Sequence, residues 1–418
     1  MTKTERSSGY QTLLVALLSL NFGIVFFDRN SLNFLMTFVQ PDLHLSNSQV
    51  GWVAGIFSFT WALAAFGISR LSDMVGNRKL LLVMATLAFS LCSFLTGLAS
   101  SFAFMIGARI LMGVAEGGIM PISHAIVAAE VAPERRGLAQ GIAQNFGSNF
   151  LGSFIAPIAL VWIAQHYGWR NAFYLAGIPG ILSAGLIWVF IKEPLGMPVA
   201  TASETHSFLE SFGGWVRAIG DALKERNVLI CVIMGIVLVA YFVICLAFMQ
   251  LFLTKVRGYS QSEASWLMAV LGLSSTIGSI GVSGFSDVIG RRPVMIAMPL
   301  LALLLPLGAM YFQGSYAVLA VIFFIGWGLV GIFPLFMATV PSESVPPAMA
   351  ATVFGLSMGS CEILGGAAGP ALAGMAADRF GLTAPLWMMV GLALIGAIAA
   401  LGLRETAPRV LARPALAA

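Results

Sequence analysis

Charged residues are scarce in this sequence of 418 residues: Asp, Glu, Lys and Arg make up 10% of it, and apolar residues make up 59%. Soluble globular domains carry about 25% charged residues. So few charges cannot cover a water-facing surface, which excludes a soluble enzyme, a nucleic-acid-binding protein and a disordered chain. The net charge of +4 does not indicate nucleic acid, because in a membrane protein the placement of the cations matters more than their sum.

Cysteines are few as well, and their positions do not indicate a disulfide, a metal site or a redox site. Cys92, Cys231, Cys245 and Cys361 lie inside apolar runs, without the spacing of a disulfide framework, a metal site or a redox pair. The sequence also lacks a phosphate-binding glycine loop, a His-Glu-x-x-His pair and a nucleophile elbow. These absences predict a protein that is not an enzyme, that uses no metal or cofactor, and that draws on an ion gradient rather than on ATP.

The sequence contains instead a series of apolar runs, each long enough to cross a bilayer as a helix. About 20 residues suffice for one crossing, whereas a β-barrel would show alternating segments of about ten. We therefore predict an all-α integral membrane protein with twelve transmembrane helices, embedded in the lipid bilayer. The predicted spans are residues 12–37, 48–70, 79–98, 102–129, 137–162, 170–192, 227–254, 262–284, 292–312, 315–340, 348–375 and 383–404.

One long polar interval divides these spans into six and six. It predicts an N-terminal six-helix bundle (1–192), a cytoplasmic linker with a surface helix (193–226) and a C-terminal six-helix bundle (227–418). With the N-terminus placed inside, sixteen of the 22 Lys and Arg residues fall on the inner side and four on the outer side. This bias follows the positive-inside rule. It predicts a multi-pass protein of the plasma membrane, the inner membrane if bacterial, with both termini in the cytoplasm.

The two halves of the chain are related by an internal repeat. When residues 46–78 are aligned with residues 260–292, nine of the 33 positions are identical. The identities include rare residue types, such as Trp52 with Trp266 and Asp73 with Asp287. Parallel duplication is typical of transporters whose substrate site lies at the interface between the halves. The repeat therefore predicts two bundles related by a pseudo-two-fold axis.

The repeated block resembles a known family motif. Residues 69–79 read Ser-x-x-x-Asp-x-x-Gly-x-Arg-Lys, and residues 283–292 read Ser-x-x-x-Asp-x-x-Gly-Arg-Arg. Both resemble the loop motif between spans two and three, and between spans eight and nine, of the major facilitator superfamily. They depart from it at Met74 and Val288, where a basic residue is common, and at the serines that replace the usual leading glycine. The resemblance covers the whole chain and implies alternating access.

The same resemblance implies an inner gate built from charges at the span ends. Asp73 and Asp287 stand beside glycines and arginines with which they can form ion pairs. Such pairs would hold the halves together on the inner side in one state and separate in the other; the alternative is a set of solvated loop charges. The predicted gate residues are Asp73, Arg78, Arg135, Arg136, Asp287 and Arg292.

A narrower resemblance is to the anion:cation symporter branch of that superfamily, which carries sugar acids and other organic anions. It rests on Phe-Asp-Arg-Asn at 27–30, on the Arg and Glu of 109–116, on Pro-Glu-Arg-Arg-Gly at 133–137 and on Tyr-Phe at 241–242. Span seven departs from the branch, with Phe-Met-Gln at 248–250 where Trp-Leu-Pro is frequent. The resemblance implies an organic-anion substrate.

Charges inside spans are the main functional candidates. A charge at the bilayer centre costs from about 2.5 to more than 10 kcal/mol unless it faces a cavity or a partner. Five lie well inside spans: Asp28, Arg29, Arg109, Glu116 and Glu362. The guanidinium groups of Arg29 and Arg109 match a carboxylate in two-pronged geometry. We therefore predict that these two arginines bind the substrate and that Asp28 and Glu116 carry protons.

Helix geometry refines this prediction. Arg109 and Glu116 are two helical turns apart, on one face, with Gly113 between them leaving room for a ligand or another helix. Asp28 and Arg29 are adjacent and point about 100° apart. The structural alternative is that Asp28–Arg29 and Arg109–Glu116 are static ion pairs that stabilise the bundle.

Five weaker candidates complete the predicted substrate site. Asn145, Asn149 and Asn33 are polar residues within spans, Tyr241 offers a hydroxyl, and Glu362 corresponds to Asn149 in the repeat at an offset of 213. Four of them have a structural alternative: an interhelical hydrogen bond for Asn145 and Asn149, core packing for Tyr241 and a buried structural acid for Glu362.

The predicted function is a proton-coupled symporter, acting as a monomer, for an organic anion that carries a carboxylate. The alternatives are an organic-anion exchanger or facilitator and, less favoured because two arginines would repel a cation, a drug:proton antiporter. A non-transporting sensor is a further class. The sequence leaves open which carboxylate is carried, the proton stoichiometry and the conformational state.

Overall fold

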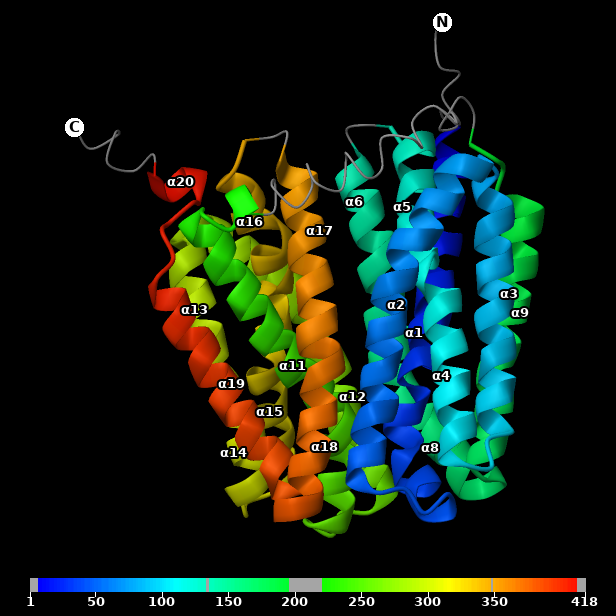
Figure 1. Ribbon diagram of the computed structural model, residues 1–418, viewed down its shortest axis with the longest axis vertical. Helices are drawn as coiled ribbons and strands as arrows, with labels where there is room; N and C mark the ends of the chain where they lie inside the picture. Colours follow the sequence, from blue (N-terminus) through cyan, green and yellow to red (C-terminus); the bar gives the residue numbers. More distant parts are fainter. Residues whose placement is uncertain (1–6, 133–134, 195–219, 347–348, 412–418) are drawn as a thin grey trace, which may run out of the picture. The chain divides into compact units, whose positions relative to one another are not determined.

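The computed structural model describes residues 7–132, 135–194, 220–346 and 349–411, and these ranges are helical without a strand. Figure 1 shows the helices in chain order. The first half holds α1 (Ser8–Asp42), α2 (Asn47–Val75), α3 (Arg78–Gly97), α4 (Phe102–Gly117), α5 (Ile119–Glu130), α6 (Arg136–Gly141), α7 (Gly147–Asn149), α8 (Ala156–Tyr167) and α9 (Trp169–Phe190). The second half holds α11 (Arg226–Lys255), α12 (Gln261–Ile289), α13 (Arg291–Ala302), α14 (Leu304–Tyr311), α15 (Tyr316–Trp327), α16 (Val340–Glu343), α17 (Ala350–Ser360), α18 (Ala368–Phe380), α19 (Thr383–Leu401) and α20 (Pro408–Leu411).

Ten helical segments in the described ranges are long and apolar enough to cross a membrane. Each coincides with one of the twelve predicted spans. The other two predicted spans, residues 48–70 and 348–375, are also helical where the chain is described: they correspond to α2 and to the run from α17 to α18. The prediction of an all-α, multi-pass membrane fold is confirmed.

Helix ends follow from local sequence. Asn77 accepts a hydrogen bond from Leu80 N–H at the start of α3, and Ser101 accepts one from Phe104 N–H at the start of α4, as N-cap residues do. Gly168 and Gly381 end α8 and α18 with φ of 85° and 81°, a conformation that only glycine adopts readily. These two glycines are equivalent in the repeat, so the two halves turn at corresponding places.

Within the described ranges, four short π-helices interrupt the spans, at Ile142–Phe146, Phe150–Ile155, Leu335–Thr339 and Cys361–Ala367. Two of them flank α7, and the last one lies between α17 and α18, in the repeat-equivalent span. π-turns are rare and are found frequently at functional sites. Asn145, Asn149 and Glu362 therefore lie within or beside irregular helix.

The chain divides into two compact units. Unit 1 consists of Met1–Leu45, Ile56–Ala202 and Ser260–Gly272, and unit 2 of Ser46–Gly55, Ser203–Tyr259 and Leu273–Ala418. The start of α2 thus belongs to unit 2, where Asp378 of α18 accepts hydrogen bonds from the N–H groups of Asn47 and Ser48 at 2.8 and 2.9 Å. The predicted bundle boundaries remain a prediction, and residues 195–219 of the predicted linker lie outside the described residues.

Close packing of α3 against α9 positions part of the site in unit 1. A Cβ added to Gly177 of α9 would lie 2.9 Å from the carbonyl oxygen of Ser90 on α3, and one added to Gly180 would lie 3.0 Å from Phe89. Small residues allow such approach between helices in a membrane. The backbone of α9 is therefore within hydrogen-bonding reach of side chains on α3.

Candidate substrate and proton site

Four of the five predicted intramembrane charges lie in unit 1, on two helices. Asp28 and Arg29 are on α1, and Arg109 and Glu116 are on α4. Asp28, Glu116 and Arg109 are 0%, 2% and 3% exposed. Asp28 and Glu116 are both within electrostatic range of Arg109. The structure therefore brings together the residues in which the sequence predicts carboxylate binding and proton transfer.

The charges in this cluster do not neutralise one another in pairs. Both carboxylate oxygens of Glu116, and Nε and Nη2 of Arg109, are buried without a hydrogen-bond partner among the described residues. Arg109 Nη1 donates to the main-chain oxygen of Arg29 at 3.5 Å and to Met112 Sδ at 3.2 Å. The described residues thus contain no Arg109–Glu116 ion pair of the kind that the structural alternative requires.

Within the described part of the chain, Arg29 is held by aromatic rings rather than by an ion pair with an acid. Its Cζ lies 4.6 Å from the ring centroid of Phe57, 5.2 Å from that of Trp61 and 5.3 Å from that of Phe26. Cation–π contacts of this length are attractive, and more so when water is excluded. The rings of α1 and α2 thus surround the guanidinium, whose N–H groups donate no hydrogen bond among the residues that the structure describes.

Asp28 and Arg29 contact different neighbours, as their offset of about 100° predicts. Asp28 Oδ1 accepts a hydrogen bond from Ser93 Oγ of α3 at 2.6 Å, and Oδ2 has no partner in the described chain. The space beside Gly113, between Arg109 and Glu116, is occupied by α2. A Cβ added to Gly113 would lie 3.0 Å from the main-chain oxygen of Phe57 on that helix.

The remaining predicted substrate residues are dispersed. Asn33 and Asn149 of unit 1 are half-buried, and Asn145 is exposed. Tyr241 of unit 2 is buried and donates its hydroxyl to the Ala302 carbonyl at 2.8 Å, and its ring lies beside Trp327. Glu362, also in unit 2, is half-buried at the start of a π-helix.

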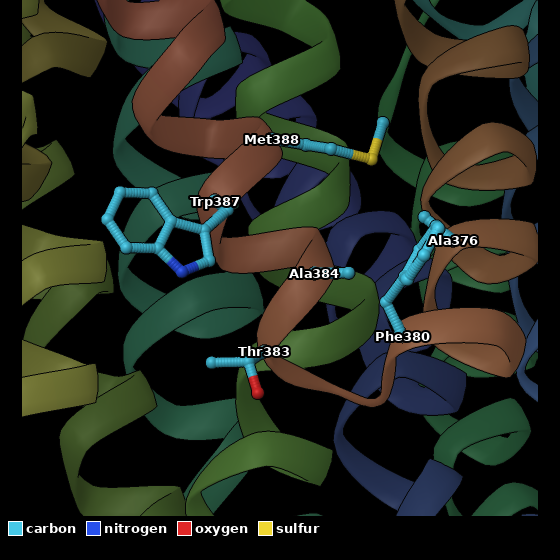
Figure 2. A pocket seen from close by; sticks show the side chains of 6 residues that line it. All are labelled: Ala376, Phe380, Thr383, Ala384, Trp387 and Met388. Carbon is cyan, nitrogen blue, oxygen red and sulfur yellow. The ribbon is translucent and has the colours of Figure 1, made fainter.

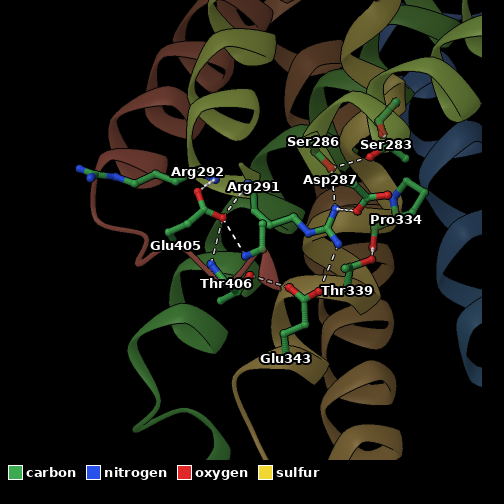
Figure 3. A network of polar contacts seen from close by, with 12 residues as sticks. Ser283, Ser286, Asp287, Arg291, Arg292, Pro334, Thr339, Glu343, Glu405 and Thr406 are labelled. Atoms are coloured by element: carbon green, nitrogen blue, oxygen red, sulfur yellow. Dashed lines mark hydrogen bonds and ion pairs between the residues drawn. The ribbon is translucent and has the colours of Figure 1, made fainter. Parts of the chain in front are cut away.

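The predicted inner gate is described most fully in unit 2. Arg291 forms ion pairs with Asp287 and, at 3.1 Å, with Glu343, and it donates to Ser286 Oγ at 2.7 Å (Figure 3). Thr406 donates to the second oxygen of Glu343 at 2.6 Å. The network joins α12, α13, α16 and the segment after α19.

The sequence predicted Arg292 for this gate, whereas in the structure Arg291 and Glu343 form the ion pair and neither was predicted. The guanidinium of Arg292 is exposed and donates to the Leu401 carbonyl at 3.0 Å. The sequence signal for Arg291 was its position directly after Gly290, which in the structure has a positive φ and leads into α13. Of the other predicted gate residues, Arg78 is buried and Arg135 is exposed. The side chains of Asp73 and Arg136 lie outside the described part of the structure.

A pocket between α18 and α19 is separate from these sites. Its volume is about 670 Å³, and it is lined by Ala376, Phe380, Thr383, Ala384, Trp387 and Met388 (Figure 2). The polar groups of that lining's side chains are the Thr383 hydroxyl and the indole N–H of Trp387. The pocket holds none of the predicted site residues and no charge to match a carboxylate.

Comparison with known proteins identifies the family. The family model for the Major Facilitator Superfamily matches residues 18–362 and 246–417. The chain belongs to this superfamily. The superfamily and the relatives below consist of membrane transporters, so this protein is a multi-pass transporter of small organic molecules and not an enzyme.

Two curated relatives and one solved structure illustrate the similarity. The D-galactonate transporter of Escherichia coli O6:H1 is 23% identical over 412 residues, 92% of this chain and 94% of the relative. The hexuronate transporter of Bacillus subtilis is 28% identical over 264 residues, 60% of each chain. The inward-facing, unoccupied crystal structure of a bacterial homologue of the human lysosomal transporter Spinster superposes with a TM-score of 0.74 at 21% identity, covering 95% of this chain and 97% of that one. This superposition supports the fold of the superfamily.

Proposed function

We propose that this transporter is a proton-coupled symporter for an organic anion that carries a carboxylate. The observation that carries the proposal is the cluster in unit 1, in which the buried Arg109 and Glu116 have polar atoms without a partner among the described residues. A buried charge without a partner is costly. Such a cost is understandable where the charge serves a ligand or a proton during the transport cycle.

Each charge has a distinct role in this proposal. Arg109 and Arg29 bind the substrate carboxylate, because guanidinium N–H groups match carboxylate oxygens. Asp28 and Glu116 carry protons. A substrate carboxylate on Arg109 reduces the field that favours the ionised acids, and protonation then becomes easier. Substrate and proton binding thus favour each other, which is the coupling that symport requires.

The relatives support an acidic substrate. Galactonate and hexuronates are sugar acids, and each bears one carboxylate that two arginines can bind. The same arginines would repel a cationic drug, which disfavours a drug:proton antiporter. We further propose that the protein works as a monomer in a bacterial inner membrane, with both termini in the cytoplasm, as the distribution of Lys and Arg favours.

A ligand screen tests the substrate part of this proposal. The purified protein is screened by thermal shift against a library of carboxylates, each paired with its amide or alcohol analogue. We expect stabilisation by a group of carboxylates and none by their neutral analogues, and we expect Arg109→Ala to remove it. If neutral analogues stabilise equally, or if Arg109→Ala binds with unchanged affinity, the carboxylate assignment is wrong.

Transport assays test the coupling part and separate it from exchange. In proteoliposomes, a symporter accumulates the carboxylate when an inward proton gradient is imposed, and a protonophore abolishes the accumulation. An exchanger instead requires internal substrate and is insensitive to the protonophore. Insensitivity to the protonophore would contradict symport and leave the organic-anion exchanger.

A further inference from the structure

Ser93 is the hydrogen-bond partner of the Asp28 carboxylate, and it also contacts a third helix. Its Oγ lies 2.6 Å from Asp28 Oδ1 on α1 and 2.9 Å from the main-chain oxygen of Phe173 on α9. Ser93 and Asp28 are both fully buried. Because α3 and α9 pack closely, the serine oxygen is fixed between the two acceptors.

The two contacts cannot both be donated at once. A serine hydroxyl has one hydrogen and two acceptor lone pairs. When Asp28 is ionised, its carboxylate has no hydrogen to give, so the Ser93 hydrogen points to Asp28. When Asp28 is protonated, its own O–H can donate to Ser93 Oγ, and the serine hydrogen is released to the Phe173 carbonyl. The heavy atoms stay in place while the hydrogen changes its acceptor.

We propose that Ser93 is a positioning residue for proton coupling, whose hydroxyl donates to ionised Asp28 and turns to the Phe173 carbonyl when Asp28 is protonated. This inference rests on the proposed proton-carrying role of Asp28. It gives each protonation state of Asp28 a satisfied hydrogen bond in a fully buried site. It also links the proton on α1 to the backbone of α9.

The charged and titratable groups around Asp28 come from three helices. Arg109 of α4 acts on Asp28 directly, and the Asp28 carboxylate in turn acts on the thiol of Cys92 on α3. Glu116 of α4 interacts with Asp28, and Arg29 of α1 interacts with Glu116. From α9, the group that contacts Ser93 is the main-chain carbonyl of Phe173. The nearest hydrogen-bonding group to Asp28 is thus neutral, and its effect adds to the field of Arg109.

A pair of serine variants on one helix tests the inference. Ser93→Ala removes the hydroxyl between Asp28 and Phe173. Ser90→Ala is the matched control, because Ser90 is also fully buried on α3 and donates to the Thr86 carbonyl of its own helix at 2.9 Å. The readouts are the pH midpoint of proton-driven carboxylate uptake and the infrared C=O band of protonated Asp28, identified by its loss in Asp28→Asn.

We expect Ser93→Ala to move the pH midpoint upward by roughly one pH unit, a tenfold change in proton affinity, because a hydrogen bond to a charged acceptor is about twice as strong as a neutral one. The Asp28 C=O band shifts in the same variant. Ser93→Thr keeps the hydroxyl and should stay near wild type, and Ser93→Cys, a weaker donor, should lie between. Should Ser93→Ala fail to fold, the Thr and Cys variants give the same comparison.

Two outcomes would contradict different parts of the account. If Asp28→Asn abolishes the pH dependence while the Ser93 variants match wild type and Ser90→Ala in midpoint and band position, the role of Ser93 is wrong and coupling through Asp28 stands. If Asp28→Asn itself keeps the wild-type pH dependence, the proposed role of Asp28 fails, and the inference fails with it.

Discussion

Glu405 accepts a hydrogen bond from the backbone N–H of Arg291 at 2.8 Å, at the first residue of α13. Its second oxygen accepts one from Arg292 N–H at 3.2 Å. Glu193 does the same for α3, accepting from the N–H groups of Arg78 and Lys79 at 2.8 and 2.9 Å. In each unit, therefore, a glutamate just beyond the last span caps the helix that follows the repeated motif. A carboxylate at a helix N-terminus accepts hydrogen bonds from otherwise unpaired N–H groups, and its negative charge interacts favourably with the positive end of the helix dipole.

We predict that Glu405→Gln lowers the free energy of unfolding by about 0.5–1 kcal/mol at neutral pH, the usual size of a charge at a helix end. The measurement is thermal or denaturant unfolding in detergent. Glu225→Gln is the matched control, since Glu225 precedes α11 and makes no side-chain cap hydrogen bond. Equal effects of the two substitutions would contradict the capping role.

The Glu405 cap should also depend on pH. Burial raises the pKa of Glu405, but hydrogen bonds from the N–H groups of Ala407, Arg291, Arg292 and Thr406 outweigh it and hold the pKa below its ordinary value. An unfolded glutamate titrates near about pH 4.3. The contribution is therefore complete above that pH and is lost as the pH falls through the lower, folded-state pKa. The stability difference between wild type and Glu405→Gln should shrink below about pH 4; a difference that grows on acidification would be inconsistent with this sign.

The Arg291 network predicts an asymmetry between two adjacent arginines. Arg291→Ala leaves Glu343 and Asp287 without their cation and should cost roughly 1–3 kcal/mol of stability. Arg292→Ala, which removes an exposed side chain bonded to one carbonyl, should cost less than half as much. Arg291→Lys should recover part of the loss, because one ammonium group cannot reproduce a forked contact with two acids. Unfolding of the three variants under one condition decides this, and equal losses at 291 and 292 would refute it.

The aromatic rings around Arg29 predict an effect on affinity separate from coupling. Phe57→Leu removes the nearest ring and leaves the guanidinium less well oriented. We expect the Kd of the carboxylate found in the screen to rise by about tenfold, or ~1.4 kcal/mol, with the protonophore sensitivity of uptake unchanged. Phe150→Leu serves as control, because Phe150 is exposed and its ring contacts are with Phe146 and Phe154. An unchanged Kd in Phe57→Leu would show that the ring does not position Arg29.

Much of the fold could be predicted from the sequence, because spans are set by the length of apolar runs. The edges were less predictable: α1 runs from Ser8 to Asp42, beyond the apolar run at 12–37. The π-helices could not be predicted, because we attribute them to packing between helices. Gly152, within one of them, packs so closely against α1 that an added Cβ would lie 2.8 Å from the carbonyl carbon of Phe26. Contacts of this kind between distant segments leave no local pattern.

The candidate site was predictable in its charges but not in its neighbours. Charges in lipid are rare, so Asp28, Arg29, Arg109 and Glu116 could be recognised individually. The aromatic rings around Arg29 and the hydrogen bond from Ser93 to Asp28 depend on how α2 and α3 are rotated about their own axes. The sequence does not determine these rotations. Which of Arg291 and Arg292 belongs to the gate depended on how the two copies of the repeat are aligned. The repeat pairs Arg78 with Arg292, whereas the helices α3 and α13 begin at Arg78 and Arg291.

The central claim, proton coupling through the buried acids of unit 1, is tested most directly by Glu116→Gln in proteoliposomes. The measurement compares uptake of the screened carboxylate driven by a proton gradient with counterflow exchange of the same carboxylate at equal pH on both sides. We predict that Glu116→Gln loses gradient-driven accumulation and retains counterflow, because the substrate still binds the arginines. Gradient-driven accumulation equal to that of the wild type would contradict the account.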